Sequence, residues 1–188
     1  MKHRAKTFLL LGALVLVASQ VATAADPIQE QLQKQWEATR NQITTIAQAV
    51  PEDKYDYKPT PDVRSFREIL QHLAGEQYMF MGFVAGEKND TSRFATMKTR
   101  AELLKALSEG YDYGAKVLAG MTDQKLLETV PFMGGQQAAR LFVVITNMKD
   151  NHEHYGNLVT YLRLNGVVPP RTAARQQQQR QQQQQPPR

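Results

Sequence analysis

Apolar residues recur at steps of three and four along most of the chain, which is the spacing of the buried stripe of an amphipathic helix. No segment alternates apolar and polar residues in the way that a half-buried strand does, so the pattern predicts an all-α protein. Glycine and proline mark where the stretches stop, because glycine caps a helix and proline cannot continue one. The four long stretches are residues 27–50, the segments that begin at Ser65 and at Thr99, and the segment between Gly135 and Pro170.

Two of the helix starts are marked by capping boxes, in which a Ser or Thr and a Glu three residues later exchange hydrogen bonds. Ser65–Glu68 predicts the start of the second helix, whose apolar stripe fades at Gly86, and Thr99–Glu102 predicts the start of the third. Residues 121–130 predict one or two short helical turns, and 131–135 a turn. Four long amphipathic helices connected in this way are expected to pack as a four-helix bundle.

The N-terminal end of the chain has the pattern of a secretory signal peptide. Three basic residues precede the apolar run Phe8–Val17, and Ala22–Ala24 supplies small residues at a cleavage position. Residues 1–24 are therefore predicted to be a signal peptide, cleaved near Ala24, and the mature protein to be periplasmic or secreted. The apolar run is far shorter than the roughly 20 residues that cross a bilayer, so no membrane span is expected.

The C-terminal end and the charge balance limit the classes of function that the sequence suggests. Residues 171–188 are rich in Gln, Arg and Pro and are predicted to be a disordered tail. The two ends hold seven of the 23 basic residues and no acidic ones, so the net charge falls from +5 for the whole chain to −2 for residues 25–170. This single predicted domain therefore gives no indication of nucleic-acid binding. The absence of cysteine excludes disulfides, thiolate ligands and thiol catalysis.

Ionisable residues follow one edge of two predicted helices. On the last helix, Asp150 and His154 are four residues apart and lie one above the other beside the apolar stripe. On the second helix, His72 lies on the flank of the stripe and Glu76 one turn further on. If these edges face each other, two imidazoles and a carboxylate converge, and such a set binds divalent metals such as Zn, Ni or Fe. Hydrogen-bonded, half-buried histidines are the structural alternative.

The segments around these residues resemble the DinB superfamily of metal-binding helical bundles. The resemblance covers nearly all of residues 27–170 and rests on His72 after Phe66-Arg67-Glu68 and on the closing motif HEHYGNLVTYLRLNGVVPP. It implies a four-helix bundle with up-down-down-up connectivity and a metal held by three side chains. These are typically histidines, one on the second helix and two spaced by four residues on the fourth, just before a Gly-Gln pair.

Transferred to this chain, the implied metal ligands are His72, Asp150 and His154. Asp150 stands where the family usually has a histidine, and Asn157 stands where it usually has a glutamine. An aspartate remains a competent ligand and adds a negative charge, which favours harder cations than three histidines do. His152 is the rival to Asp150, although residues two apart do not share a helix face.

The resemblance favours an exported, metal-dependent hydrolase or group transferase that acts on a small-molecule substrate. Known activities in the family resemble thiol-dependent transferases and isomerases, and export argues against a small thiol as the co-reactant. Glu76 is the candidate general base, Tyr161 or Tyr155 a proton donor or substrate contact, and Arg163 an anchor for an anionic group. The alternative is a non-catalytic bundle that binds a metal, a small molecule or a protein partner through a degenerate site. Bundles commonly form homodimers, but the sequence does not indicate which face would be used.

Overall fold

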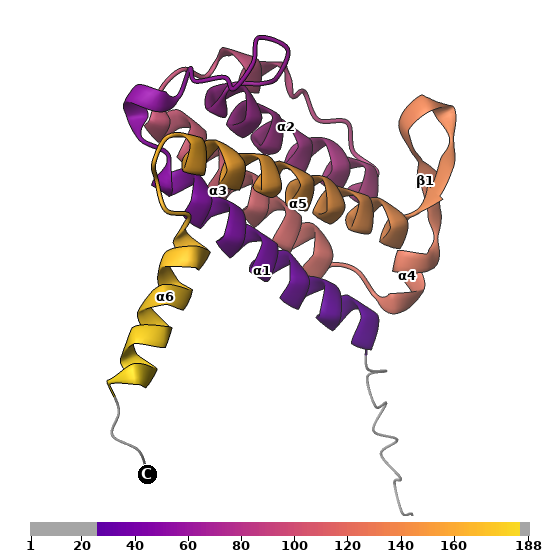
Figure 1. Cartoon of the computed structure of the whole chain (residues 1–188). Helices are drawn as coiled ribbons and strands as arrows, with labels where there is room; N and C mark the ends of the chain where they lie inside the picture. Colours follow the sequence, from indigo (N-terminus) through magenta and orange to yellow (C-terminus); the bar gives the residue numbers. More distant parts are fainter. Residues whose placement is uncertain (1–25, 185–188) are drawn as a thin grey trace, which may run out of the picture.

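Four long helices form the body of the protein (Figure 1). The computed structural model describes residues 26–184, so the predicted signal peptide, residues 1–24, lies outside the described residues. The prediction of an all-α fold is confirmed. The four helices are α1 (Pro27–Ala49), α2 (Phe66–Ala85), α3 (Arg100–Ala119) and α5 (Arg140–Leu164).

Both predicted capping boxes form in the structure. The Ser65 side chain accepts a hydrogen bond from the Glu68 N–H at 3.2 Å, and Glu68 Oε2 accepts one from the Ser65 N–H at 2.6 Å. Thr99 and Glu102 make the same reciprocal pair. Gly86 ends α2 with φ 79°, a left-handed conformation that glycine adopts without strain.

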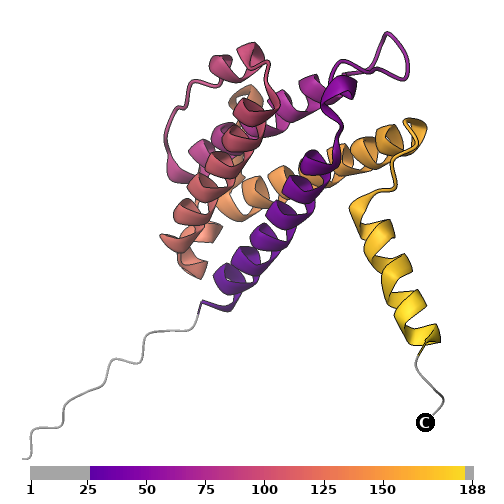
Figure 2. The same cartoon turned by 90° about the vertical axis from the view of Figure 1, so that its left-hand side faces the viewer.

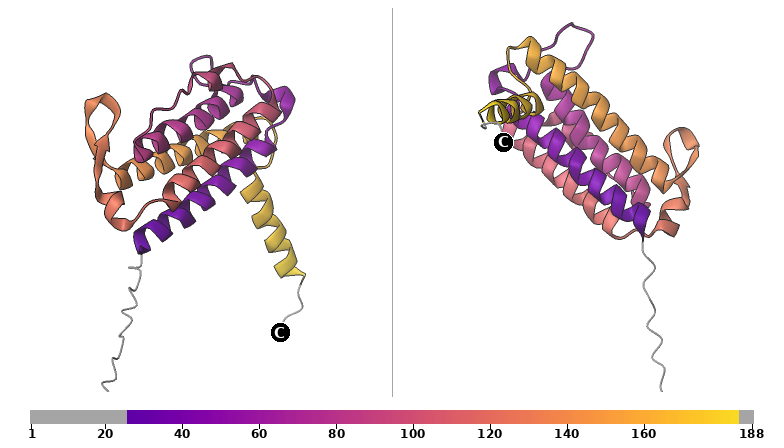
Figure 3. Two further views of the ribbon diagram at one scale, coloured as in Figure 1. Left: turned by 180° about the vertical axis from the view of Figure 1, so that it is seen from behind. Right: turned by 60° about the horizontal axis from the view of Figure 1, so that its bottom comes forward.

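The helices run up, down, down and up, and each packs against two others. α1 and α2 both contact α3 and α5. Arg100, which begins α3, donates to Gln48 O at the end of α1, at 2.7 Å, and Arg140, which begins α5, donates to Val84 O at the end of α2. α1 and α3 are therefore antiparallel, as are α2 and α5. The parallel pair α2 and α3 is joined by a long connection, residues 86–99, that returns along the bundle (Figures 1 and 3).

Aromatic and aliphatic side chains from all four helices meet along the bundle axis. Trp36 of α1 is 1% exposed, its Nε1 donates to Tyr111 O at 2.9 Å, and the two rings meet edge to face at 5.4 Å. Gly114 makes this contact possible, because a Cβ there would lie 2.7 Å from Trp36 Cε2 and Cη2. Other fully buried side chains are Ile43, Leu70, Leu73, Leu107, Val144 and Leu158.

The segment between α3 and α5 differs from the prediction. Residues 121–130 contain the short helix α4 (Asp123–Leu127), but the predicted turn is part of a hairpin in which β1 (Thr129–Pro131) pairs antiparallel with β2 (Gln137–Ala139). Gly134 and Gly135 take positive φ at its tip, within η3 (Met133–Gly135). Strands of three residues are too short to show alternation, so the pattern did not reveal them. The other 3-10 turns in the described part of the chain are η1 (Glu52–Lys54) and η2 (Ser92–Thr96).

The C-terminal segment also differs from the prediction, because a helix stands where a disordered tail was expected. α6 (Pro170–Gln183) begins with proline in its first turn and continues through Ala, Gln and Arg, which are good helix formers. No residue of α6 is buried, and the helix leads away from the bundle (Figure 2). It therefore adds no side chain to the core. Within residues 26–184, no helix combines the length and apolarity needed to cross a membrane.

Candidate metal centre

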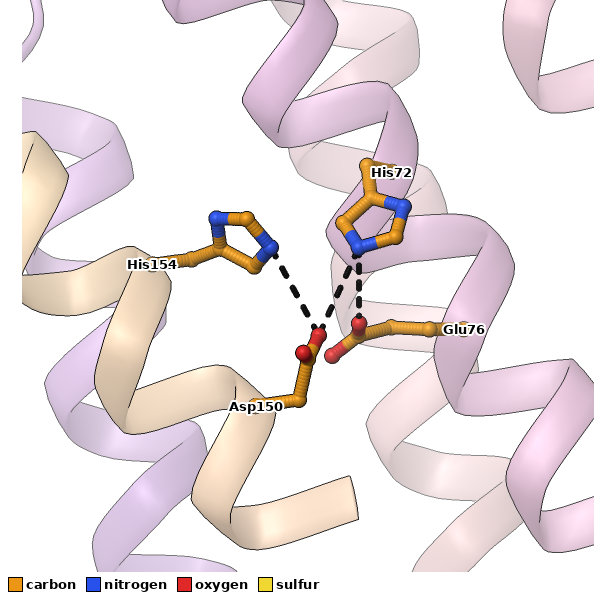
Figure 4. A group of neighbouring side chains, drawn as sticks. All are labelled: His72, Glu76, Asp150 and His154. Atoms are coloured by element: carbon orange, nitrogen blue, oxygen red, sulfur yellow. Dashed lines mark ion pairs between the residues drawn. The ribbon is translucent and has the colours of Figure 1, made fainter. Parts of the chain in front are cut away.

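The antiparallel pair α2 and α5 brings His72, Glu76, Asp150 and His154 to one point (Figure 4). One possible ligand atom from each residue lies within 4.8 Å of the other three. His72 Nε2 is 3.2 Å from Glu76 Oε2 and 3.4 Å from Asp150 Oδ2. His154 Nε2 is 3.5 Å from the same Asp150 oxygen. The two predicted ionisable edges therefore do face each other.

The four side chains differ in how far they reach toward solvent. The side chain of Glu76 is 1% exposed and that of His154 8%, whereas those of His72 and Asp150 are each 33% exposed. The cluster therefore has a buried floor, formed by Glu76, and a side that water or a small molecule can reach.

The contacts within the cluster fit ligands of a shared cation better than they fit hydrogen bonds. Glu76 Oε2 and Asp150 Oδ2 are both buried and accept no hydrogen bond within residues 26–184. Ligand atoms about 2.1 Å from one ion stand roughly 3.0 to 3.4 Å apart at octahedral or tetrahedral angles. The separations of 3.2, 3.4 and 3.5 Å between imidazole nitrogens and carboxylate oxygens are close to this range. The residues present therefore suit a divalent metal.

Burial and neighbouring groups shift the pKa values of the cluster residues in different directions. Burial, and then the neighbouring Asp150, raise the pKa of Glu76 well above the ordinary value of 4.5. The imidazole of His72 holds the pKa of Asp150 well below its usual range. Burial lowers the pKa of His154 and so favours its neutral form, which is the form that coordinates metals. Asp150 thus supplies the ready negative charge, and Glu76 is the carboxyl that a cation would have to deprotonate.

A buried polar network lies directly behind Glu76. Asn151 Nδ2 donates to Glu76 Oε1 and to Asn147 O, each at 2.8 Å. Asn151 Oδ1 accepts from Gln77 Nε2 at 2.9 Å and from the Tyr111 hydroxyl. Sequence reasoning missed this network, and its one signal was Gln77, a polar residue at an apolar position of the second helix. Asn151, Asn147 and Gln77 are each 0% exposed.

The structure separates the two rivals on α5. Asp150 lies in the cluster, whereas His152 is exposed and its Nδ1 is 2.7 Å from Met148 O of its own helix. A tautomer with a proton on Nδ1 makes this a hydrogen bond. His152 is thus turned away from the other two imidazoles, and no local distortion of α5 brings it in.

Of the other predicted site residues, Tyr161 lies near the cluster and Arg163 does not. Tyr161 is two helical turns beyond His154 on the same face, and its hydroxyl donates to Arg64 O at 3.0 Å. Arg163 is exposed on the opposite side of α5, where it lines a pocket beside α6. Tyr155 lines that same pocket and is partly buried.

Two pockets adjoin the cluster, one on each side. The first, of about 320 Å³, lies between α2 and η2 and includes His72 and Glu76 in its wall. The second, of about 420 Å³, lies between α5 and the segment before α2, with His154, Asn157 and Tyr161 in its wall. Each is large enough for a small molecule to reach the imidazoles.

Facing helices that direct imidazoles and carboxylates to one point define the class of metal-binding helical bundles. The comparisons with known proteins identify the family within this class. The sequence model of the DinB superfamily matches residues 35–158, and the chain therefore belongs to this superfamily, whose fold binds metals. One relative is YjoA, an uncharacterized protein of Bacillus subtilis (strain 168). It is 24% identical over 132 residues, which are 68% of this chain and 84% of YjoA.

Solved structures show the same fold. The crystal structure of YjoA, a DinB-like protein from Bacillus subtilis, has a TM-score of 0.61 and 21% identity over 73% of this chain and 93% of that one. A DinB-like protein from Bacillus cereus ATCC 10987 has a TM-score of 0.68 and 12% identity, over 75% and 95%. A DinB family protein from Exiguobacterium sibiricum 255-15 has a TM-score of 0.62 and 19% identity, over 74% and 92%.

Proposed function

We propose that this protein is an exported, metal-dependent hydrolase or group transferase that acts on a small molecule. The observation that carries the proposal is that buried oxygens of Glu76 and Asp150, which have no hydrogen-bond partner within residues 26–184, converge on the imidazoles of His72 and His154. A buried carboxylate oxygen without a donor is costly, and a divalent cation shared with neutral imidazoles removes that cost. The two imidazoles favour Zn, Ni or Fe, and the carboxylates extend the choice to Mn.

The residues around the cluster support chemistry at its exposed side. When bound, a divalent ion acts as a Lewis acid and lowers the pKa of a coordinated water. His72 and Asp150, each 33% exposed, stand at the side from which a substrate would approach. Tyr161 lines the pocket beside His154, which supports a contact with a substrate there, and its hydroxyl proton is donated to Arg64 O. Tyr161 therefore serves as an acceptor toward a substrate.

Elemental analysis of the mature protein, purified without an affinity tag or added metal, tests the metal site. We expect about one divalent ion per chain, lost in His72→Ala and His154→Ala and weakened in Asp150→Ala. His152→Ala is the matched control and should keep the metal, because its ring bonds to its own helix. Parent protein that takes up none of Zn, Ni, Fe or Mn, or four variants that all bind like the parent, would rule the site out.

The exported location has its own test. Expression of the full chain in a Gram-negative host, followed by fractionation and intact-mass measurement, should give periplasmic protein that begins at Ala25. A cytoplasmic product that retains residues 1–24 would remove export from the proposal and leave the metal site unaffected.

One observation favours the non-catalytic alternative. If His72, Glu76, Asp150 and His154 all bind one tetrahedral ion, they fill its coordination sphere, as in structural metal sites. Catalytic sites keep one coordination position open. Water-proton relaxation of the Mn(II)-loaded protein tests for an open position, because a coordinated, exchanging water enhances the relaxation. Absence of enhancement would support a closed binding module, whereas enhancement would establish the open position that an enzyme requires.

A further inference from the structure

We infer that Glu76 is a fourth metal ligand and that Asn151 is the positioning residue that fixes it. The inference rests on the proposed metal site and deepens it. It replaces the role of general base, which the sequence suggests for Glu76, and it gives a purpose to the buried network formed by Asn151, Gln77 and Tyr111.

The hydrogen bonds of Asn151 leave its amide only one orientation. Its oxygen accepts from Gln77 Nε2 and from the Tyr111 hydroxyl, and its nitrogen donates to Glu76 Oε1 and Asn147 O. An asparagine amide has two donors and two main acceptor sites, so all four are used. A flipped amide would place its oxygen against Glu76 Oε1 and its N–H groups against two donors. The donor end is therefore held toward Glu76.

This orientation decides what the Glu76 carboxylate can do. Oε1 is engaged by Asn151 at 2.8 Å, which leaves Oε2 to face His72 Nε2 at 3.2 Å. Oε2 is buried and has no hydrogen-bond partner within residues 26–184. A general base must reach the proton that it removes, and Glu76 Oε2 is buried against His72 on the floor of the cluster, although part of Glu76 lines the pocket between α2 and η2. Because Asn151 holds Oε1, the carboxylate of Glu76 is oriented so that Oε2 can bind a metal ion.

The fourth ligand changes which metal the site prefers. Two carboxylates and two neutral imidazoles balance the charge of a divalent ion at a centre where Glu76 is almost fully buried. Carboxylate oxygens favour Mn(II) and Fe(II) relative to a three-histidine set, and these ions accept six ligands. Such an ion keeps two positions open with all four protein ligands bound, so the fourth ligand is compatible with catalysis.

The experiment measures Mn(II) and Zn(II) affinities of the full mature protein by chelator competition, in the parent and in four variants. Glu76→Gln and Asn151→Leu test the ligand and its support, and Tyr111→Phe removes only the hydroxyl that holds Asn151. Tyr113→Phe is the matched control, because that hydroxyl, two residues further along α3, donates to Glu87 instead. The absorption spectrum of the Co(II)-loaded protein reports the coordination geometry.

Mutation of a residue that supports a metal ligand typically lowers metal affinity about 10 to 100-fold. We expect a loss of this size in Mn(II) affinity for Asn151→Leu, and a loss at least as large for Glu76→Gln, which removes the ligand itself. Tyr111→Phe should show a smaller loss and Tyr113→Phe none. Glu76→Gln should also shift the preference from Mn(II) toward Zn(II) and change the Co(II) spectrum, which a purely structural role would not do.

Two results would overturn the inference while leaving the metal site intact. Parent-like Mn(II) affinity in Glu76→Gln, with metal lost in His72→Ala, would show that Glu76 is not a ligand. Parent-like binding in both Asn151→Leu and Tyr111→Phe, with loss in Glu76→Gln, would show that the network does not position it. Absence of metal binding in the parent would instead refute the proposed function itself.

Discussion

Glu76→Gln should make the metal-free protein more stable and weaken its stabilisation by Mn(II). Glu76 Oε2 and Asp150 Oδ2 are buried acceptors that lie 3.2 and 3.4 Å from His72 Nε2, and neither has a hydrogen-bond partner within residues 26–184. In the variant, the amide oxygen still accepts from Asn151, and the amide nitrogen takes the place of Oε2 and directs its N–H groups at Asp150. The substitution thus removes the acceptor Oε2 of residue 76 and gives Asp150 Oδ2 a hydrogen-bond donor.

The size of the effect follows from the cost of a buried acceptor without a partner, about 1–3 kcal/mol. For a chain of this length, each kcal/mol at the midpoint moves Tm by about 2–4 °C. The variant should therefore unfold about 2–12 °C higher than the parent when both are free of metal. The magnitude depends on pH, since a protonated Glu76 can itself donate to Asp150.

The sign of the pH dependence is set by the raised pKa of Glu76. Between the ordinary value of 4.5 and the raised value in the fold, the native protein holds a proton that the unfolded chain has released. Stability of the parent is therefore lost as pH rises through this window, whereas glutamine does not titrate. The advantage of Glu76→Gln should be small near pH 4.5 and grow toward neutral and alkaline pH.

Thermal unfolding followed by circular dichroism, in the presence of a chelator and at several pH values, measures the difference. Glu109→Gln, an exposed carboxylate on α3 paired with Lys105, is the control and should stay within about 0.5 kcal/mol of the parent. A variant less stable than the parent without metal at neutral pH, or a stability difference that does not change with pH, would show that Glu76 Oε2 is not a costly buried acceptor.

Three further outcomes follow from the structure. Apparent metal affinity should rise with pH, because the pKa of Glu76 is raised and the ion must displace its proton. Calorimetry in buffers of different ionisation enthalpy would detect the released proton, and binding heats that do not depend on the buffer would contradict this prediction. Gly114→Ala should cost about 1–3 kcal/mol in chemical denaturation through overlap with Trp36, whereas Gly156→Ala, with nothing within 4 Å, should gain about 0.5–1 kcal/mol. Deletion of residues 171–188 should leave Tm and metal content unchanged, because α6 buries no side chain, and a lower Tm would assign α6 a structural role.

Local sequence signals fixed the helices and their ends. Capping boxes at Ser65 and Thr99 and the glycine after α2 are interactions between residues at most five apart, so the sequence displays them directly. The same is true within the site. Asp150 and His154 share a face of α5 because they are four residues apart. His152 is two residues from each of them, and its side chain lies on a different face, as its spacing predicts.

The way in which one helix sits against another depends on tertiary packing. The register of α2 against α5 places Glu76 on the floor of the cluster, and it puts Asn151 against Tyr111 and Glu76, which are 40 and 75 positions away in the chain. Such contacts depend on how side chains of different helices interlock, and helical periodicity reports only which face is apolar. The hairpin between α4 and α5 is likewise held by pairing between strands rather than by its own pattern. The sequence thus determined which residues could bind a metal, and packing determined which of them meet and what holds them there.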